Sequence, residues 1–303
     1  MRLYSYYLKK LGKMPLFLDR YLYTPCLLRL KKVNYFCGMD NASKEIYPFK
    51  EKITRYDHSL STALLTWKLT ENVEATIAAL FHDASTPCFS HVIDYMNKDY
   101  IVQESTEEFQ EKILKKDLYL NNLLKKDKIN IDNIINFKKH TIVDNNRPKL
   151  CADRLDGIIL TGISWTQSIE KEDIDTIIDN IEIFTNEDNE QEIGFKDKDV
   201  AKKVYELSEE INDYTQSNVD TYMMELLANI TRTAIEDKLI TYEYLYDLNE
   251  DELFKIFKRS KNVEFQNNIN RFKTMKKEEI KKIDLPPIKK RKLNPLVQGK
   301  RLH

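Results

Sequence analysis

The chain contains few of the residues that punctuate sheet-rich folds. Its 303 residues include only 6 Gly and 8 Pro, which is too few for the many turns of a β-sandwich or barrel. No apolar run reaches the roughly 18 to 20 residues that cross a bilayer, and residues 1–10 lack a continuous apolar signal core. We therefore expect long helices, no membrane partner and a cytoplasmic location.

Neither sign of charge is in excess, and cysteine is sparse. The 48 Lys and Arg residues balance 49 Asp and Glu residues, for a formal net charge of −1, which argues against a surface that is polycationic throughout. The 4 cysteines form no C-x-x-C pair and are typical of small buried residues in a reducing compartment. Hydrophobic residues still make up 42%, enough for a sizeable core.

Apolar residues at helical spacing recur along most of the chain, and Thr24-Pro25 is typical of a helix start. The periodic segments are residues 57–70, 74–83, 105–124, 132–140, 147–161, 171–184, 200–214, 221–238 and 251–273. Residues 186–195 are polar enough for an exposed loop or short hairpin. We predict an all-α fold, with a helical core in residues 1–165 that holds the metal site and a helical C-terminal lobe with a basic tail in residues 166–303, packed as one unit.

The tail contains the basic run Lys289-Lys290-Arg291-Lys292. Such a run is compatible with a solvated surface, with a contact to phosphate or nucleic acid, and with a nuclear-import address. The sequence does not choose among the three.

Three of the five histidines, His58, His82 and His91, lie in or beside the most core-like segments. A buried imidazole needs a partner or ligand, because an unpaired buried polar group costs roughly 1 to 3 kcal/mol. The pair His82-Asp83 ends an apolar run, and a divalent cation would satisfy both side chains. Further ligands must come from other helices, and His58 and Asp153 are the candidates. Two imidazoles and two carboxylates suit Mn, Fe, Ni, Co, Mg or Zn.

In this order, His58, His82-Asp83 and Asp153 resemble the H…HD…D signature of the HD superfamily of metal-dependent phosphohydrolases. The surrounding strings are similar to the dNTP triphosphohydrolase branch, which includes the sterile-alpha-motif and HD-domain protein. R-Y-D-H-S-L around His58 is similar to R-F-E-H-S-L, and H-D-A-S-T-P-C-F-S-H from His82 is similar to H-D-L-G-H-x-P-F-S-H. Thr24-Pro25 followed by Arg29-Leu30 matches a T-P-x-x-x-R-L opening. The resemblance covers about residues 20 to 160.

The resemblance implies roles for ten residues. As metal ligands it implies His58, His82, Asp83 and Asp153. As phosphate-facing residues it implies Arg55 and Arg154, for which a planar cationic fork is well suited. As catalytic residues it implies His91, Asp94 and Glu104, with His91 and Asp94 side by side at i and i+3. Thr86, the tenth, is a substrate-binding residue.

The chain departs from the branch at four positions. Ser85-Thr86 stand where the branch has Gly-His, so an acid for the leaving group is missing. Thr86 donates a hydrogen bond but is no acid near pH 7, which removes a contribution typically worth about 10²- to 10⁴-fold in rate. Gln103 replaces a histidine, and Gly157 replaces a tyrosine near the sugar.

These observations predict a metal-dependent phosphohydrolase that cleaves a phosphoester or phosphoanhydride of a nucleotide-like substrate, with a (d)NTP among the candidates. The resemblance also implies a homo-oligomer. The alternative is a catalytically weak nucleotide- and metal-binding regulatory module of the same fold. A third reading is a single-stranded nucleic-acid binder or nuclease that uses residues 289–292 and whose affinity falls steeply with salt.

Overall fold

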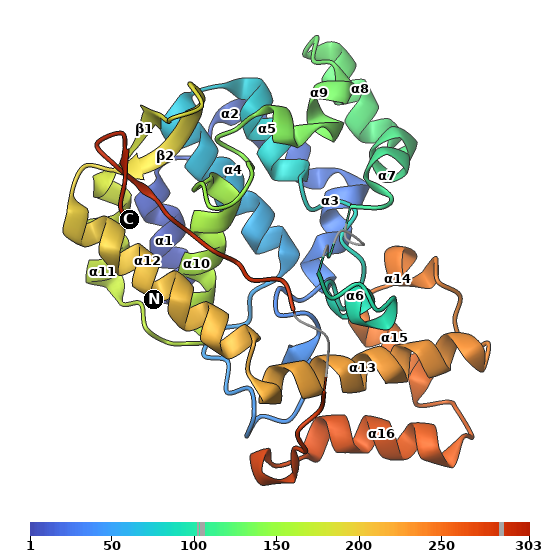
Figure 1. Ribbon diagram of the computed structural model, residues 1–303. Coiled ribbons are helices and arrows are strands. Elements are labelled where there is room, and N and C mark those ends of the chain that lie inside the picture. The colour runs from blue at the N-terminus through green and yellow to red at the C-terminus, as the bar shows by residue number, and fades with distance from the viewer. Residues whose placement is uncertain (102, 104–106, 285–287) are drawn as a thin grey trace.

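The computed structural model describes residues 1–101, 103, 107–284 and 288–303, and Figure 1 shows a mostly helical molecule with one small sheet. The helices of the first half are α1 (Leu3–Leu11), α2 (Leu16–Asp19), α3 (Pro25–Arg29), α4 (Arg55–Thr70), α5 (Val73–Phe81), α6 (Val92–Met96), α7 (Gln110–Lys116), α8 (Leu118–Lys126), α9 (Ile131–Ile135) and α10 (Ala152–Ser164). Those of the second half are α11 (Lys171–Asn180), α12 (Lys198–Thr215), α13 (Asn218–Glu236), α14 (Tyr244–Asp247), α15 (Glu250–Phe257) and α16 (Val263–Thr274). Short 3-10 turns are η1 (Arg20–Tyr23), η2 (Leu30–Lys32), η3 (Met39–Asn41), η4 (Phe137–Lys139) and η5 (Lys277–Glu279).

Helix α4 lies at the centre of the molecule and packs against α5, α10 and α1. Residues Ala75 to Phe81 of α5 are all buried, so this stretch is apolar apart from Thr76 because other elements cover it on all sides. On α10 the buried side chains run from Leu155 to Ser164, with Gly157 half-buried. Helix α4 carries His58 and α10 carries Asp153, while His82 and Asp83 directly follow α5.

The loop before α10 explains why this helix starts later than the predicted residue 147. The backbone N–H of Ala152 donates to Ile142 O at 2.8 Å, and that of Asp153 donates to Val143 O at 3.2 Å. The loop thus satisfies two of the first-turn donors that a helix leaves open. Asp153 is thereby fixed in the first turn of α10.

The small sheet corrects the all-α prediction. It comprises β1 (Ile181–Thr185), β2 (Gln191–Phe195), β3 (Leu296–Val297) and β4 (Lys300–Arg301), in that spatial order. Strands β1 and β2 form an antiparallel hairpin, one of the two alternatives expected for residues 186–195, although most of β2 is buried. Strand β3 joins β2 in parallel, with Leu296 opposite Gly194. A Cβ atom at 194 would lie 2.7 Å from Leu296 Cβ, so glycine permits this approach.

Periodicity misassigned part of the sheet because its strands are short. Residues 181–184 were expected to continue a helix, but α11 ends at Asn180 and β1 begins at Ile181. The two-residue strands β3 and β4 are too short to show an alternating pattern. The helices expected in residues 200–214, 221–238 and 251–273 are confirmed as α12, α13 and the pair α15 and α16.

Residues 288–303, which we call the C-terminal arm, are extended and tie the sheet to the core. In Figure 1 the arm, in red, runs from the middle of the view to the sheet. Its anchor is Arg301, whose guanidinium donates to both carboxylate oxygens of the fully buried Glu192 at 2.6 and 2.7 Å.

Two further expectations bear on the molecule as a whole. All four cysteines are free, and Cys26, Cys88 and Cys151 are buried, as predicted. Among the described residues, no helix combines the length and apolarity that a membrane crossing demands.

Candidate metal centre

The start of α4 places two of the predicted residues. Thr54 and Asp57 form a capping box, in which Asp57 N donates to Thr54 Oγ1 at 3.2 Å and Thr54 N donates to Asp57 Oδ2 at 2.8 Å. This cap fixes the first turn, from which Arg55 and His58 project. His58 is 1% exposed, so its imidazole depends on partners inside the protein.

His82 reaches the same place from the end of α5. Its Nδ1 donates to Ala79 O at 2.7 Å, which leaves Nε2 to face Nε2 of His58 at 3.2 Å. Two imidazole nitrogens at this distance need a proton or a cation between them, because two lone pairs repel.

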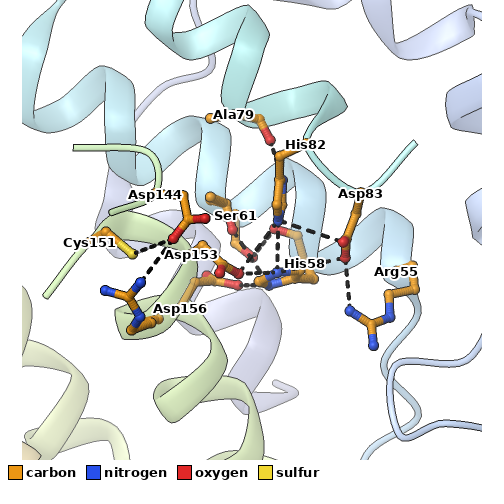
Figure 2. Close-up of polar contacts among 12 residues, drawn as sticks. Arg55, His58, Ser61, Ala79, His82, Asp83, Asp144, Cys151, Asp153 and Asp156 are labelled. Atoms are coloured by element: carbon orange, nitrogen blue, oxygen red, sulfur yellow. Dashed lines mark hydrogen bonds and ion pairs between the residues drawn. The ribbon is translucent and has the colours of Figure 1, made fainter. Parts of the chain in front are cut away.

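Two carboxylates complete the cluster (Figure 2). Asp153 Oδ1 lies 2.9 Å from His58 Nε2 and 3.5 Å from His82 Nε2. Asp83 lies farther out, with one carboxylate oxygen 3.9 Å from His58 Nε2 and the other 4.0 Å from His82 Nε2. The structure thus brings together the four side chains that the sequence proposed as ligands, from α4, the end of α5 and the first turn of α10.

The charges of the cluster fit a divalent cation. Burial alone would raise the pKa of Asp83, but Arg55 and the two imidazoles hold it below its usual range. The pKa of Asp153 is likewise lowered, because hydrogen bonds from His58 and His82 outweigh burial. Burial also opposes the charged form of His58, yet hydrogen bonds to Asp153 and Asp156 raise its pKa to about 10. Two ionised carboxylates therefore hold positive charge between the imidazoles, where a metal would supply it.

One ligand atom each from His58, His82 and Asp83 lies within 4.8 Å of the others. This mixed nitrogen and oxygen donor set suits a transition-metal or related divalent ion. A second cluster, of Asp144, Cys151 and Asp153, has similar spacing. However, Arg154 Nη2 already pairs with Asp144 at 3.0 Å, so a guanidinium supplies the positive charge there.

Asp156 supports the cluster and was not anticipated from the sequence. It is fully buried, and its Oδ2 lies 2.7 Å from His58 Nδ1 while its Oδ1 accepts from Tyr7 OH at 2.8 Å. A carboxylate on the far nitrogen of a ligating histidine fixes the tautomer and the ring orientation. The available signal was its spacing, since Asp156 follows Asp153 by three positions on one helix face.

A cavity of about 520 Å³ borders the cluster. Its lining includes His58, His82, Asp83 and Asp153 together with Arg55, His91 and Arg154. Arg55 Nη1 pairs with Asp83 Oδ2 at 2.9 Å and its Nε donates to Ser90 Oγ at 3.2 Å. Arg154 mainly holds the loop before α10, through Asp144, Asn145 and the carbonyl of Lys149. Both arginines are therefore held in a fixed orientation in the cavity wall.

The remaining predicted residues fall in different places. His91 Nδ1 donates to Asp94 Oδ2 at 2.8 Å, at the start of α6, and burial lowers the pKa of His91 although Asp94 opposes this. Thr86 is fully buried and donates to Asp83 Oδ1 at 3.0 Å. It is absent from the described cavity lining, so its hydroxyl contacts the candidate metal ligand Asp83 and does not face the cavity. Glu104 lies outside the described residues.

Tyr35 occupies the space that a side chain at position 157 would need. A Cβ atom built there would lie 2.9 Å from Tyr35 OH. The Tyr35 ring centroid is 5.0 Å from that of His58, and the Arg55 guanidinium carbon is 4.9 Å from the Tyr35 centroid. Burial raises the pKa of Tyr35, so the phenol stays a donor. A phenol from the loop before α4 thus fills the space beside position 157.

Comparisons with known proteins agree with this geometry. Residues 55–158 match the family described as HD domain. The chain is 28% identical over 216 residues to the uncharacterised protein YdhJ of Bacillus subtilis, across 71% of this chain and 64% of that protein. It is 23% identical over 250 residues to a protein of Cordyceps militaris named metal-dependent phosphohydrolase cns2, across 80% of this chain and 71% of that protein. The chain therefore spans less than two thirds of the length of YdhJ.

These similarities support an HD domain in residues 55–158 and a divalent metal cofactor. Neither relative's name refers to dNTP triphosphohydrolases. Membership of that branch stays a prediction.

Proposed function

We propose that this chain is a metal-dependent phosphohydrolase that cleaves a phosphoester or phosphoanhydride of a nucleotide-like substrate, and that His58, His82, Asp83 and Asp153 hold the metal. The observation that carries the proposal is the convergence of the His58, His82 and Asp153 side chains, within 3.5 Å of one another, on the wall of a cavity of about 520 Å³. A cavity of this volume falls in the usual range for small-molecule sites.

A bound divalent cation polarises a phosphoryl oxygen and makes a water ligand more acidic. The protein's own residues would provide the rest. Arg55, held by Asp83 and Ser90, offers a fixed guanidinium to the developing charge on a phosphate. His91 donates from Nδ1 to Asp94, so Nε2 of the neutral ring carries a lone pair that accepts a proton from water or the substrate.

The test compares two histidine substitutions. His82→Ala removes a proposed ligand, whereas His140→Ala removes a histidine outside the cluster and serves as the matched control. We expect His82→Ala to lower bound metal, measured by elemental analysis, and to abolish hydrolysis of a panel of nucleotides and generic phosphoesters. The His140→Ala variant should retain both the bound metal and the hydrolytic activity. Unchanged turnover in His82→Ala would refute the proposal.

The same panel decides the alternative of a regulatory module with little turnover. The observation in its favour is Thr86, whose hydroxyl is bound to Asp83 and supplies no acid for a leaving group. Tight nucleotide binding to metal-loaded protein without product would support the module. Release of phosphate, pyrophosphate or triphosphate would reject it, and release of triphosphate from a dNTP would place the chain in the triphosphohydrolase branch. Light scattering of the same sample tests the proposed homo-oligomer.

A further inference from the structure

The basic run of the C-terminal arm is divided between two faces. Lys289, Arg291 and Leu293 line the cavity, whereas Lys290 and Lys292 are exposed. Extended backbone sends successive side chains to opposite sides, so only alternate members of the run reach the interior. The arm is therefore a wall of the same cavity that the metal cluster borders.

The backbone around Arg291 is held on both sides. Lys289 N donates to Tyr100 O at 2.9 Å, Asn212 Nδ2 donates to Arg291 O at 3.2 Å, and Asn294 N donates to Pro148 O at 2.9 Å. These bonds keep the arm against the core on either side of Arg291. Its guanidinium enters the cavity, where Nη2 donates to the neutral amide oxygen of Gln103 at 3.0 Å.

A second arginine meets the arm from the loop before α10. Arg147 also lines the cavity, and its Nη1 donates to Lys292 O at 3.1 Å. Burial, together with the positive charges of Arg154 and Arg291, lowers the pKa of Arg147 to about 10. The two partly buried guanidinium groups of Arg147 and Arg291 therefore repel each other.

Neither guanidinium forms an ion pair in the part of the chain that the structure describes, although Arg291 acts at longer range on the buried Asp220. Arg55 pairs with Asp83 and Arg154 pairs with Asp144, but no described carboxylate forms an ion pair with Arg147 or Arg291. Charge removed from water without a counter-charge is unfavourable. A ligand anion between the two would relieve both the repulsion and the desolvation.

We propose that Arg147 and Arg291 form an anion subsite in this cavity, and that the substrate carries a second anionic group in addition to the phosphate that is cleaved. The claim that the bound compound is a substrate rests on the proposed function. Anion binding at the subsite does not require a metal. Compounds with two linked phosphates satisfy it, since each guanidinium presents a planar fork of donors to phosphate oxygens. A substrate with one phosphate leaves the subsite empty.

The direct test is binding without metal. Full-length protein treated with EDTA is titrated with inorganic pyrophosphate by calorimetry. We expect Arg147→Gln and Arg291→Gln each to weaken binding by about 10- to 100-fold, as for loss of a charged hydrogen bond, and Arg291→Lys to recover part of it. Lys290→Gln and Lys292→Gln, exposed neighbours in the same run, are the controls and should change binding less than about twofold. Equal losses in the control and test variants would overturn the subsite.

Hydrolysis by metal-loaded protein then separates the subsite from the proposed function. AMP and ADP differ by one phosphate, so Arg291→Gln should lower kcat/KM for ADP far more than for AMP. If His82→Ala abolishes hydrolysis but Arg291→Gln affects the two nucleotides equally, the proposed function stands and the subsite is refuted. If pyrophosphate binding depends on Arg291 and no phosphate compound is hydrolysed, the subsite stands and the proposed function is refuted.

Discussion

Gly157→Ala tests the contact between α10 and Tyr35. The new Cβ would lie 2.9 Å from Tyr35 OH, and no other described heavy atom outside its own neighbourhood lies within 4 Å. Ordinary contact begins near 3.4 Å, so the phenol must move by about 0.5 Å while its ring is held beside His58 and Phe36. Overpacking of this kind costs about 1 to 3 kcal/mol, whereas alanine in a helix interior gains about 0.5 to 1 kcal/mol over glycine.

Whether Gly157→Ala stabilises or destabilises the protein should depend on the Tyr35 hydroxyl. In the wild-type background we expect Gly157→Ala either to leave the free energy of unfolding unchanged or to lower it by up to about 2 kcal/mol. In a Tyr35→Phe background the obstructing atom is gone, so the same change should stabilise the protein by about 0.5 to 1 kcal/mol. Urea denaturation followed by circular dichroism measures all four proteins, and the double-mutant cycle gives the coupling.

Gly162→Ala is the control for this cycle. Its Cβ would meet Ile169 Cδ1 at 2.5 Å, a contact that the Tyr35 hydroxyl does not influence. Its cost should therefore be the same in both backgrounds. If Gly157→Ala also has the same effect in both, the hydroxyl is not the obstruction and the reasoning is refuted.

Three other predictions concern buried carboxylates. Burial raises the pKa of Glu250 to about 8, above its usual 4.5, so the folded state binds this proton more tightly. The free energy of unfolding should fall by up to about 5 kcal/mol as pH rises from about 4.5 to 8, and Glu250→Gln should flatten that slope in urea titrations. Asp156→Asn should weaken metal binding about 10- to 100-fold by releasing His58, measured by competition with a chelating dye, and unchanged affinity would contradict its orienting role. Arg301→Ala leaves Glu192 charged and buried, so thermal or urea unfolding should show a loss of about 3 to 5 kcal/mol, and a loss below about 1 kcal/mol would contradict it.

The sequence predicted the parts of the site that depend on local strings. His58, His82, Asp83 and Asp153 each lie in a recognisable segment, and their helices were identified from 3.6-residue periodicity. The structure brings these side chains together, although their role as ligands is still to be tested by metal binding.

What the sequence did not predict depends on contacts between distant segments. The sequence indicated only that Gly157 replaces a tyrosine. The fold shows that Tyr35 occupies the space beside position 157. Arg147 and Arg291 are 144 positions apart (291 − 147), and neither belongs to a pattern that links it to the other. Strand β3 was not predicted for the same reason, because its two residues show no periodicity and it pairs with Gly194 and Phe195 of β2, about a hundred positions earlier.

The hydrogen bond from Tyr7 to Asp156 has a consequence for the first helix. Because Asp156 orients His58, α1 belongs to the same linked network as the proposed ion. A cation that binds only the folded cluster should therefore slow the transient detachment of α1. Deuterium uptake at the amides of α1 would then report occupancy of a centre that those amides never touch.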